Sequence, residues 1–398
     1  LARFQQLVLV NLLSMTASTR WAFGAFFFLY FAYIGLMSPY ASLYFAELGF
    51  GAIEIAALMS MLQVTRILGP FSWGWLSDYL SNRVGIMRFC AVLACVTFVA
   101  IFYLQEYIPL LIWMFVLHTI LSSMVPLGEA ATVHALYKEE SFYHRYGRIR
   151  LWGSIGFITM VLIAGEIFHW QGIVIFPWLG VAVLILLVIN TFFLREPKIE
   201  RQPLVRGELR SVLRRPEVRW FLLSAFAMIF GHAALYVFYS LYLLDLGYNK
   251  FQIGLFWTLG VLAEVIFFYF QSKVLARYSP TAMLQMTFVV GVIRFVLIGY
   301  FASTSFLIVA QLMHAATFAA HHSASTRLIQ TWFTGPLQAR GQALFTTVAY
   351  GFGGSLGGLC AGWIWDQLGP NQVFGMAAVA CSLAGLAIYQ VKPSMVKT

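Results

Sequence analysis

The sequence predicts an all-α membrane protein with twelve transmembrane helices in two pseudo-symmetric six-helix bundles. Of its 398 residues 61% are hydrophobic and only 10% are charged, whereas soluble domains carry about 25% charged residues. Apolar runs of about 20 residues, the length that crosses a bilayer as a helix, recur along the chain. Segments of the first half also reappear in the second. These three observations predict the fold class.

The apolar runs define the expected spans. They cover residues 21–46, 52–76, 88–105, 109–136, 150–169, 172–194, 219–245, 252–275, 281–302, 305–331, 338–365 and 372–391. Several connections are only a few residues long, so neighbouring helices are expected to run antiparallel. The longest polar stretch follows the sixth span, which predicts a bundle over 1–194, a cytoplasmic linker over 195–218 and a second bundle over 219–398.

The basic residues predict the orientation. Of the 25 Lys and Arg residues, Lys250 falls in an external loop and Arg66, Arg294 and Arg327 fall within spans, if both termini are inside. All the others then lie on the cytoplasmic side, as the positive-inside rule requires. The net charge of +10 therefore faces the cytoplasm and anionic lipid headgroups, not nucleic acid. We expect a multi-pass protein of a bacterial inner membrane with both termini cytoplasmic.

The internal repeat locates the expected site. "SLYFAELGF" (42–50) reappears as "SLYLLDLGY" (240–248), and "GSIG" (153–156) as "GSLG" (354–357), at nearly the same offset. Two six-helix halves related in this way hold a transported solute near the bilayer midplane, between the halves.

Three other features of the sequence resemble a signal peptide, a phosphate loop and a metal or redox site, but each lacks residues that such a feature needs. The start, "LARFQQLVLVNLLS", imitates a signal peptide but lacks a small-residue cleavage site, so an amphipathic cytoplasmic segment is expected. "GFGGSLGG" (351–358) has the spacing of close helix contacts and lacks the strand and the Lys-Ser/Thr of a phosphate loop. The cysteines lie in apolar segments without metal or redox spacing and are expected to pack: Cys90, Cys95, Cys360 and Cys381.

Charged residues within apolar spans point to function. Placing a charge at the centre of a bilayer costs roughly 2.5–3.5 kcal/mol even on the lenient insertion scale. Arg66, with Gln63 one turn earlier on the same face, therefore needs a cavity or an acid beside it. Glu264, the central acid of "GVLAEVIFFYFQ" (260–271), is either neutralised by a partner or changes charge during function. Arg294, near the middle of the next span, is its expected direct partner, either in a permanent structural ion pair or in one that breaks when Glu264 takes a proton.

A first motif carries a family resemblance. In "GWLSDYLSNRVG", Gly74, Asp78 and Arg83 follow the second span, and the stretch resembles the loop 2–3 signature of the major facilitator superfamily. The resemblance implies a tight helix end at which Asp78 pairs with guanidinium groups and gates the cytoplasmic side.

A second set of motifs resembles one branch of that superfamily. "PLGE" (126–129) and "YGRIRLWGSIGF" (146–157) are similar to stretches of the lactose permease and phenylpropionate-type permeases. The resemblance implies that Glu129 and Arg150 bind substrate, although they could equally form a structural or gating pair. It also implies a proton-coupling group of Glu264, Arg294 and His314. The pattern is incomplete, because Thr317 stands where that branch has an acid.

Aromatic and histidine side chains complete the expected site. His314, Thr317 and His321 share one helix face, and His232, Tyr236 and Tyr239 share another. Tyr33 belongs to a tyrosine-rich face of the first span. Substrate contact and hydrogen-bonded packing remain alternatives for each of these residues, and their spacing does not support a metal site.

We therefore expect a proton-coupled symporter that imports a small organic solute, an aromatic carboxylate such as a phenylpropionate-like acid. A sugar or nucleoside is the alternative solute, and antiport remains open. A membrane enzyme is disfavoured because the sequence shows no clustered nucleophile or metal ligands. A non-transporting sensor is disfavoured because the sequence shows no signalling domain. We expect a monomer that works with solute, protons and lipid, without nucleic acid, metal or cofactor.

Overall fold

The computed structural model describes residues 17–80, 82–136, 142–196, 209–334 and 337–391. Within the helices, the side chains at 17, 70, 71, 74, 75, 78, 142–145 and 209 also lie outside the description. All regular secondary structure in the described part is helical. The predicted amphipathic segment before the first span lies outside the described residues.

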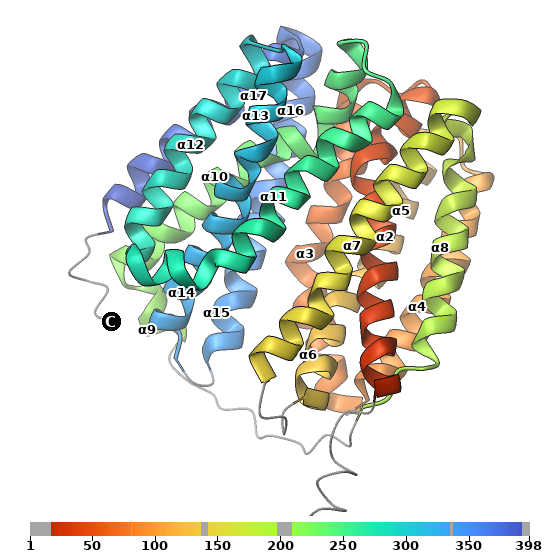
Figure 1. Ribbon diagram of the computed structural model, residues 1–398, viewed down its shortest axis with the longest axis horizontal. Helices are drawn as coiled ribbons and strands as arrows, with labels where there is room; N and C mark the ends of the chain where they lie inside the picture. The colour runs from red at the N-terminus through yellow and green to blue at the C-terminus, as the bar shows by residue number, and fades with distance from the viewer. Residues whose placement is uncertain (1–16, 81, 137–141, 197–208, 335–336, 392–398) are drawn as a thin grey trace, which may run out of the picture.

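The helices fall into two sets that lie side by side in Figure 1. The first set comprises α2 (Ala17–Glu47), α3 (Ala52–Leu80), α4 (Arg83–Val99), η1 (Ala100–Phe102), α5 (Tyr107–Leu121), α6 (Met124–Leu136), α7 (Phe142–Gln171), η2 (Ile173–Ile175) and α8 (Phe176–Thr191). After the short α9 (Leu209–Leu213), the second set comprises α10 (Pro216–Asp245), α11 (Lys250–Arg277), α12 (Pro280–Tyr300), α13 (Thr304–Leu312), η3 (Ala315–Ala320), α14 (His321–Trp332), α15 (Gln338–Phe345), η5 (Thr346–Gly353), α16 (Gly354–Leu368) and α17 (Pro370–Tyr389).

Each of the twelve predicted spans is occupied by helix. Among the described residues, 11 helices are long and apolar enough to cross a membrane, with α5 and α6 counted as one span over Tyr107–Leu136. The predicted tenth span, 305–331, is built from three consecutive pieces, α13, η3 and α14. Because η3 is a π-helix, this span changes its helical winding in the middle. The η5 segment is also a π-helix and interrupts the eleventh span.

The turns at one end of the bundle repeat between the two sets. Four glycines have positive φ values in the described backbone: Gly49 (89°), Gly172 (80°), Gly247 (88°) and Gly369 (92°). Gly49 and Gly247 follow the first helix of each set, and Gly172 and Gly369 precede the last. A side chain with a Cβ is strained in this region of backbone space, so glycine is needed at these helix ends. The sequence repeat is thus also a repeat of backbone conformation.

The two sets touch through small residues. A Cβ on Gly362 of α16 would lie 2.4 Å from the Cβ of Ala56 in α3, and a Cβ on Gly254 of α11 would lie 3.0 Å from the carbonyl oxygen of Val161 in α7. Small side chains let membrane helices approach this closely. These contacts lie toward the end that the charge distribution assigns to the outside, and α7 crosses α11 there in Figure 1.

Candidate functional site

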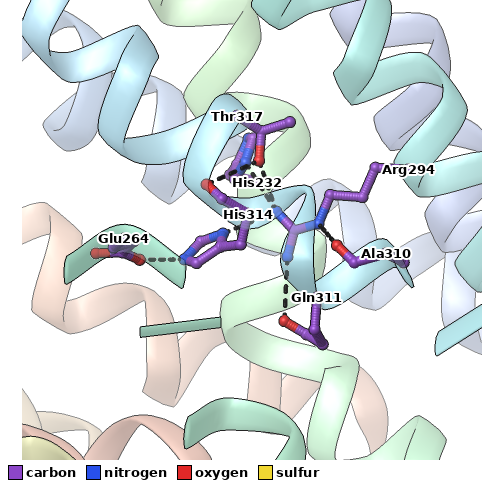
Figure 2. Close-up of polar contacts among 7 residues, drawn as sticks. All are labelled: His232, Glu264, Arg294, Ala310, Gln311, His314 and Thr317. Atoms are coloured by element: carbon purple, nitrogen blue, oxygen red, sulfur yellow. Dashed lines mark hydrogen bonds and ion pairs between the residues drawn. The ribbon is translucent and has the colours of Figure 1, made fainter. Parts of the chain in front are cut away.

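A fully buried arginine organises the second set of helices. Arg294 of α12 has 0% of its surface exposed. Its Nε donates to the carbonyl oxygen of Ala310 at 2.8 Å, and its Nη2 donates to Oε1 of Gln311 at 3.4 Å. Its Nη1 donates to Oγ1 of Thr317 at 2.8 Å and to Nδ1 of His314 at 2.8 Å (Figure 2). These partners are all uncharged oxygen or nitrogen acceptors.

His314 connects this arginine to the central acid. Its Nε2 lies 2.6 Å from Oε1 of Glu264, which comes from α11 (Figure 2). An arginine can only donate hydrogen bonds, so Nδ1 of His314 must accept. We therefore assign the ring proton to Nε2, which donates it to Glu264. Arg294 in this way fixes the tautomer of the histidine that faces the acid.

A second histidine closes the cluster from α10. His232 is fully buried, and its Nδ1 lies 3.0 Å from the carbonyl oxygen of Met228. Nδ1 therefore carries the proton, which leaves the lone pair of Nε2 facing Nη1 of Arg294 at 3.5 Å. Both histidines present an acceptor to the guanidinium.

The π-helix η3 provides this geometry. His314 immediately precedes η3 and Thr317 lies within it, and both reach the same Nη1 atom of Arg294. Single π-turns inside α-helices are frequent at functional sites. The described structure contains no direct ion pair between Glu264 and Arg294, whose direct pairing was one expectation from the sequence. The α13–η3 segment, which packs against both α11 and α12, places His314 between them.

The first set of helices contributes the predicted acid–base pair. Nε of Arg150 on α7 lies 3.3 Å from Oε1 of Glu129 on α6. The two side chains are 32% and 38% exposed, so this pair is reachable from solvent. The guanidinium of Arg150 also stacks over the ring of Phe31 on α2, with 4.2 Å between its Cζ and the ring centroid. Cation–π contact supports its position without using its hydrogen-bond donors.

Arg66 of α3 is arranged differently. Its Cζ lies 5.3 Å from the ring centroid of Tyr350, which belongs to the π-helix η5 of the other set. Among the residues that the structure describes, Arg66 forms no hydrogen bond and no ion pair. Gln63, one turn earlier, is 8% exposed and its Oε1 is buried without a hydrogen-bond partner in the described structure. Arg66 also lies within electrostatic range of Tyr30 and Tyr236.

The other predicted contacts are spread out. Tyr239 and Tyr33 are fully buried and their hydroxyl groups have no partner in the described structure. The ring of Tyr33 packs against Phe98, inside the first set. His321 packs against the ring of Phe288, with 5.7 Å between ring centroids. Tyr236 packs beside His232, so it belongs with the Arg294 cluster.

The predicted gate includes side chains that the structure does not describe. The side chains of Gly74 and Asp78 are among those not described. Nη1 of Arg83 lies 2.6 Å from Oε1 of Glu196, and Nδ1 of His134 lies 3.3 Å from the same oxygen. Glu196, in the segment after α8, thus links Arg83 of α4 with His134 of α6. Glu196 is a partner that the motif did not indicate.

Sequence reasoning did not predict three contacts of the arginines: Gln311 with Arg294, Tyr350 with Arg66, and Phe31 with Arg150. Gln311 lies three residues before His314, so helical spacing alone could have placed it on the face that His314 shares with Thr317. Tyr350 and Phe31 meet their arginines across helix interfaces. No sequence spacing signals that kind of contact.

The comparisons with known proteins show the family of the chain. The MFS_1 like family matches residues 20–376 of the chain. The chain belongs to this family. A relative described as a probable 3-phenylpropionic acid transporter of Escherichia coli K12 is 30% identical over 371 residues, covering 91% of this chain and 95% of the relative. The maltose permease of Geobacillus stearothermophilus is 22% identical, covering 94% of each chain.

Solved structures of transporters share the fold. A crystal structure of a point mutant of the nucleoside transporter NupG superposes with a TM-score of 0.84 at 16% identity, covering 94% of this chain and 99% of that one. A point mutant of the Escherichia coli fucose–proton symporter FucP gives a TM-score of 0.62 at 15% identity, with 94% and 98% covered. The MFS_1-like chain is therefore a multi-pass membrane transporter with the major facilitator fold, and not an enzyme.

The site has two chemically distinct parts. The Glu264–His314–Arg294 relay contains one carboxyl group that can take or release a proton. Arg66 offers a guanidinium whose donors are free among the described residues, beside aromatic rings. Such a guanidinium can bind a carboxylate through two parallel hydrogen bonds. Together they can hold an organic anion and a proton at once.

Proposed function

We propose that this transporter is a proton symporter that imports an aromatic carboxylate, such as a phenylpropionate-like acid. We further propose that it works as a monomer in a bacterial inner membrane, with both termini in the cytoplasm. The observation that carries the proposal is Arg66, a guanidinium within a transmembrane helix that has no carboxylate partner among the described residues. A charge in that place is costly and needs a compensating ligand.

The other two central arginines are less suited to bind the substrate anion. Arg294 is fully buried and its donors serve four acceptors from α13, η3 and the turn between them. Arg150 already has the carboxylate of Glu129 at 3.3 Å. A substrate carboxylate would have to displace an existing partner at either residue. At Arg66 it displaces no hydrogen bond of the described structure.

The surroundings of Arg66 favour an aromatic substrate. Tyr350 already stacks against the guanidinium, and Tyr30 and Tyr236 lie within electrostatic range of it. Aromatic rings pair favourably with one another in offset or edge-to-face arrangements. A carboxylate bound at Arg66 would thus place an attached ring among tyrosines. The 3-phenylpropionic acid transporter among the relatives supports the same substrate class.

Glu264 is the proposed coupling residue. Its side chain is 14% exposed, and the neutral ring of His314 is its hydrogen-bond partner within the described structure. Burial disfavours the charged form of a carboxyl group, whereas a hydrogen-bond donor stabilises it. A movement that changes the contact with His314 would therefore change proton binding. The rocking of the two halves around a central site supplies such movement.

A sugar or nucleoside is the second candidate substrate. The Glu129–Arg150 pair, with both side chains partly exposed, is suited to accept and donate hydrogen bonds to hydroxyl groups. The maltose permease and the nucleoside permease NupG of Escherichia coli K12, the latter 21% identical, are relatives that favour this interpretation. A neutral solute of either kind gives Arg66 no role.

Binding by the purified protein separates these candidates. We predict that 3-phenylpropionate binds to the wild type, and that Arg66→Gln weakens binding at least tenfold, about 1.4 kcal/mol. Isothermal titration with 3-phenylpropionate, its neutral amide, maltose and uridine measures this directly. Arg277→Gln, at an exposed arginine near the end of α11, is the matched control. Undiminished carboxylate binding by Arg66→Gln, or binding of only maltose or uridine, would refute the proposal.

A further inference from the structure

The charges in the middle of the helices are almost balanced. Arg150 is paired with Glu129 directly, and Arg294 is linked to Glu264 through His314. Each of these two groups contains one positive and one negative side chain. Arg66 has only an aromatic ring beside it. The described centre therefore holds one positive charge that no carboxylate offsets.

Only one group in the relay is free to bind an additional proton. His314, before η3, contacts Glu264 directly. The other titratable and charged groups near Glu264 are Arg294 on α12, Arg150 on α7, Tyr236 on α10 and Tyr350 in η5, and His232 on α10 belongs to the same cluster through its contact with Arg294. Arginine and tyrosine side chains are already protonated at neutral pH. The histidines accept a hydrogen bond from Arg294 at their unprotonated nitrogens, so a proton there would break that bond.

The carboxyl group of Glu264 avoids this conflict. Nε2–H of His314 can donate to one oxygen of Glu264 in both protonation states. The other oxygen can then take the proton without breaking the contact between His314 and Arg294. The relay thus has room for one proton, and that proton lies on Glu264.

Each ligand alone would change the charge of the centre. A proton on Glu264 removes a negative charge and leaves Arg294 unbalanced. A carboxylate at Arg66 adds a negative charge and removes the existing excess. When both bind, the total returns to its starting value. The bound proton and the bound carboxylate carry opposite charges, and opposite charges attract more strongly in a site of low dielectric than in water, so each ligand favours binding of the other.

We infer that the transporter carries one proton and one monocarboxylate together as a charge-neutral pair, and that transport is therefore electroneutral. This inference rests on the proposed function. The proton passes from external water to an oxygen of Glu264, the carboxylate passes from external water to Arg66, and both leave on the cytoplasmic side. Loaded and empty forms have the same charge, so the membrane potential exerts no net force on the cycle.

A pH gradient should then be the whole driving force. A tenfold difference in proton concentration supports about tenfold accumulation of the anion. A cycle with two protons, or with a proton and a neutral solute, would also respond to the membrane potential. The dependence on potential therefore distinguishes the stoichiometries.

The experiment uses the full-length protein in proteoliposomes with radiolabelled 3-phenylpropionate. Initial uptake is measured with a pH gradient, at zero potential and with an inside-negative potassium diffusion potential set by valinomycin. Because the neutral acid itself crosses bilayers, protein-free liposomes under the same gradients are subtracted. Charge movement is recorded in parallel on a solid-supported membrane. Glu264→Gln should lose the pH-driven component, whereas Glu166→Gln, at an exposed acid on α7, should keep it.

The outcomes are separable. Protein-dependent uptake that rises with the pH gradient, is unchanged by the potential and gives no steady current is the expected result. Uptake that an inside-negative potential stimulates severalfold, with a current, would overturn electroneutrality and leave the proposed function standing. No protein-dependent uptake and no binding of 3-phenylpropionate would overturn the proposed function, and this inference with it.

Discussion

At the scale of single residues, the central feature is a buried arginine held by neutral acceptors. Arg294 is fully buried, yet its hydrogen bonds go to a carbonyl, an amide, a hydroxyl and two imidazole nitrogens. Buried guanidinium groups normally need each donor satisfied. The arrangement gives each of the three guanidinium nitrogens at least one acceptor and at the same time directs the proton of His314 toward Glu264. One side chain thereby sets the chemistry of two others.

The first prediction at this scale concerns Glu264. Glu264→Gln makes the group permanently neutral, so it can no longer carry a proton across the membrane. We expect pH-driven accumulation of 3-phenylpropionate to be lost and exchange of substrate between the two sides to persist. Counterflow and uptake measurements in proteoliposomes test both parts.

The alternative role of Glu264 gives a different result. If it only helps to hold α11 and α13–η3 together, the substitution removes the acceptor for His314 and lowers stability and binding together. Accumulation against a gradient by Glu264→Gln would show that another group carries the proton.

A second residue-scale prediction concerns Thr317. Its hydroxyl oxygen accepts from Nη1 of Arg294 at 2.8 Å and is buried. Thr317→Val keeps the shape but removes an acceptor from a buried charge, which costs about 1–3 kcal/mol. We expect a lower unfolding temperature, measured in detergent, and recovery in Thr317→Ser. A Thr317→Val protein as stable as the wild type would mean that the guanidinium has another acceptor.

At the scale of elements, the two π-helices lie where the site is built. The η3 segment supplies Thr317 and follows His314, and η5 supplies Tyr350 beside Arg66. A π-turn changes the direction of side chains relative to a regular helix. Both interruptions therefore bring side chains of the second set toward the centre.

The sequence predicted the elements well where apolar length decides. The helix bounds of α2, α10, α11 and α17 lie within a few residues of the expected spans, because unbroken apolar runs mark them. The π-helices were not predicted, since winding depends on tertiary packing rather than on composition. The tenth span was expected as one helix and contains a break, because apolar length does not reveal a local change of winding.

A prediction at this scale concerns the contact between α3 and α16. A Cβ on Gly362 would lie 2.4 Å from the Cβ of Ala56 and 3.1 Å from the carbonyl oxygen of Ala52. Gly362→Val should therefore force the two helices apart at the end assigned to the outside, where these contacts hold the two sets closed against each other. Spin labels at Glu47 and Asp245, exposed at the ends of α2 and α10, should move several ångströms apart in pulsed electron resonance.

The matched control is Gly385→Val on α17. The nearest atom to its Cβ position is 3.6 Å away, an ordinary contact within the second set. We expect no change in the label distance there. An unchanged distance in Gly362→Val would show that this contact does not hold the end closed.

At the scale of the whole molecule, the proposed site combines residues from both sets of helices. Glu129, Arg150 and Arg66 come from the first set, and Glu264, His314 and Arg294 come from the second. The domain bounds at 194 and 219 remain predictions, although the paired glycines at the helix ends support a repeat.

Sequence reasoning identified every charged residue of this centre. Arg66 and Glu264 were conspicuous as charges within apolar spans, and the family resemblance indicated Glu129, Arg150 and Arg294. It did not identify how they are connected. It expected a direct partnership of Glu264 with Arg294, whereas His314 lies between them. It offered both Arg150 and Arg66 as substrate-binding residues, and the structure distinguishes them, because Arg150 is paired with Glu129 whereas Arg66 has only an aromatic ring beside it. Side-chain pairing across helices is a tertiary property that spacing along one helix does not encode.

The central claim is that substrate and proton bind together, at Arg66 and Glu264. The most direct test measures the protons taken up when 3-phenylpropionate binds to purified protein in weakly buffered detergent solution, over a series of pH values. At pH values where Glu264 is ionised in the free protein, we predict uptake of about one proton per bound substrate by the wild type. Glu264→Gln should bind the substrate without proton uptake. Binding without proton uptake by the wild type at every pH, or undiminished uptake by Glu264→Gln, would contradict the account.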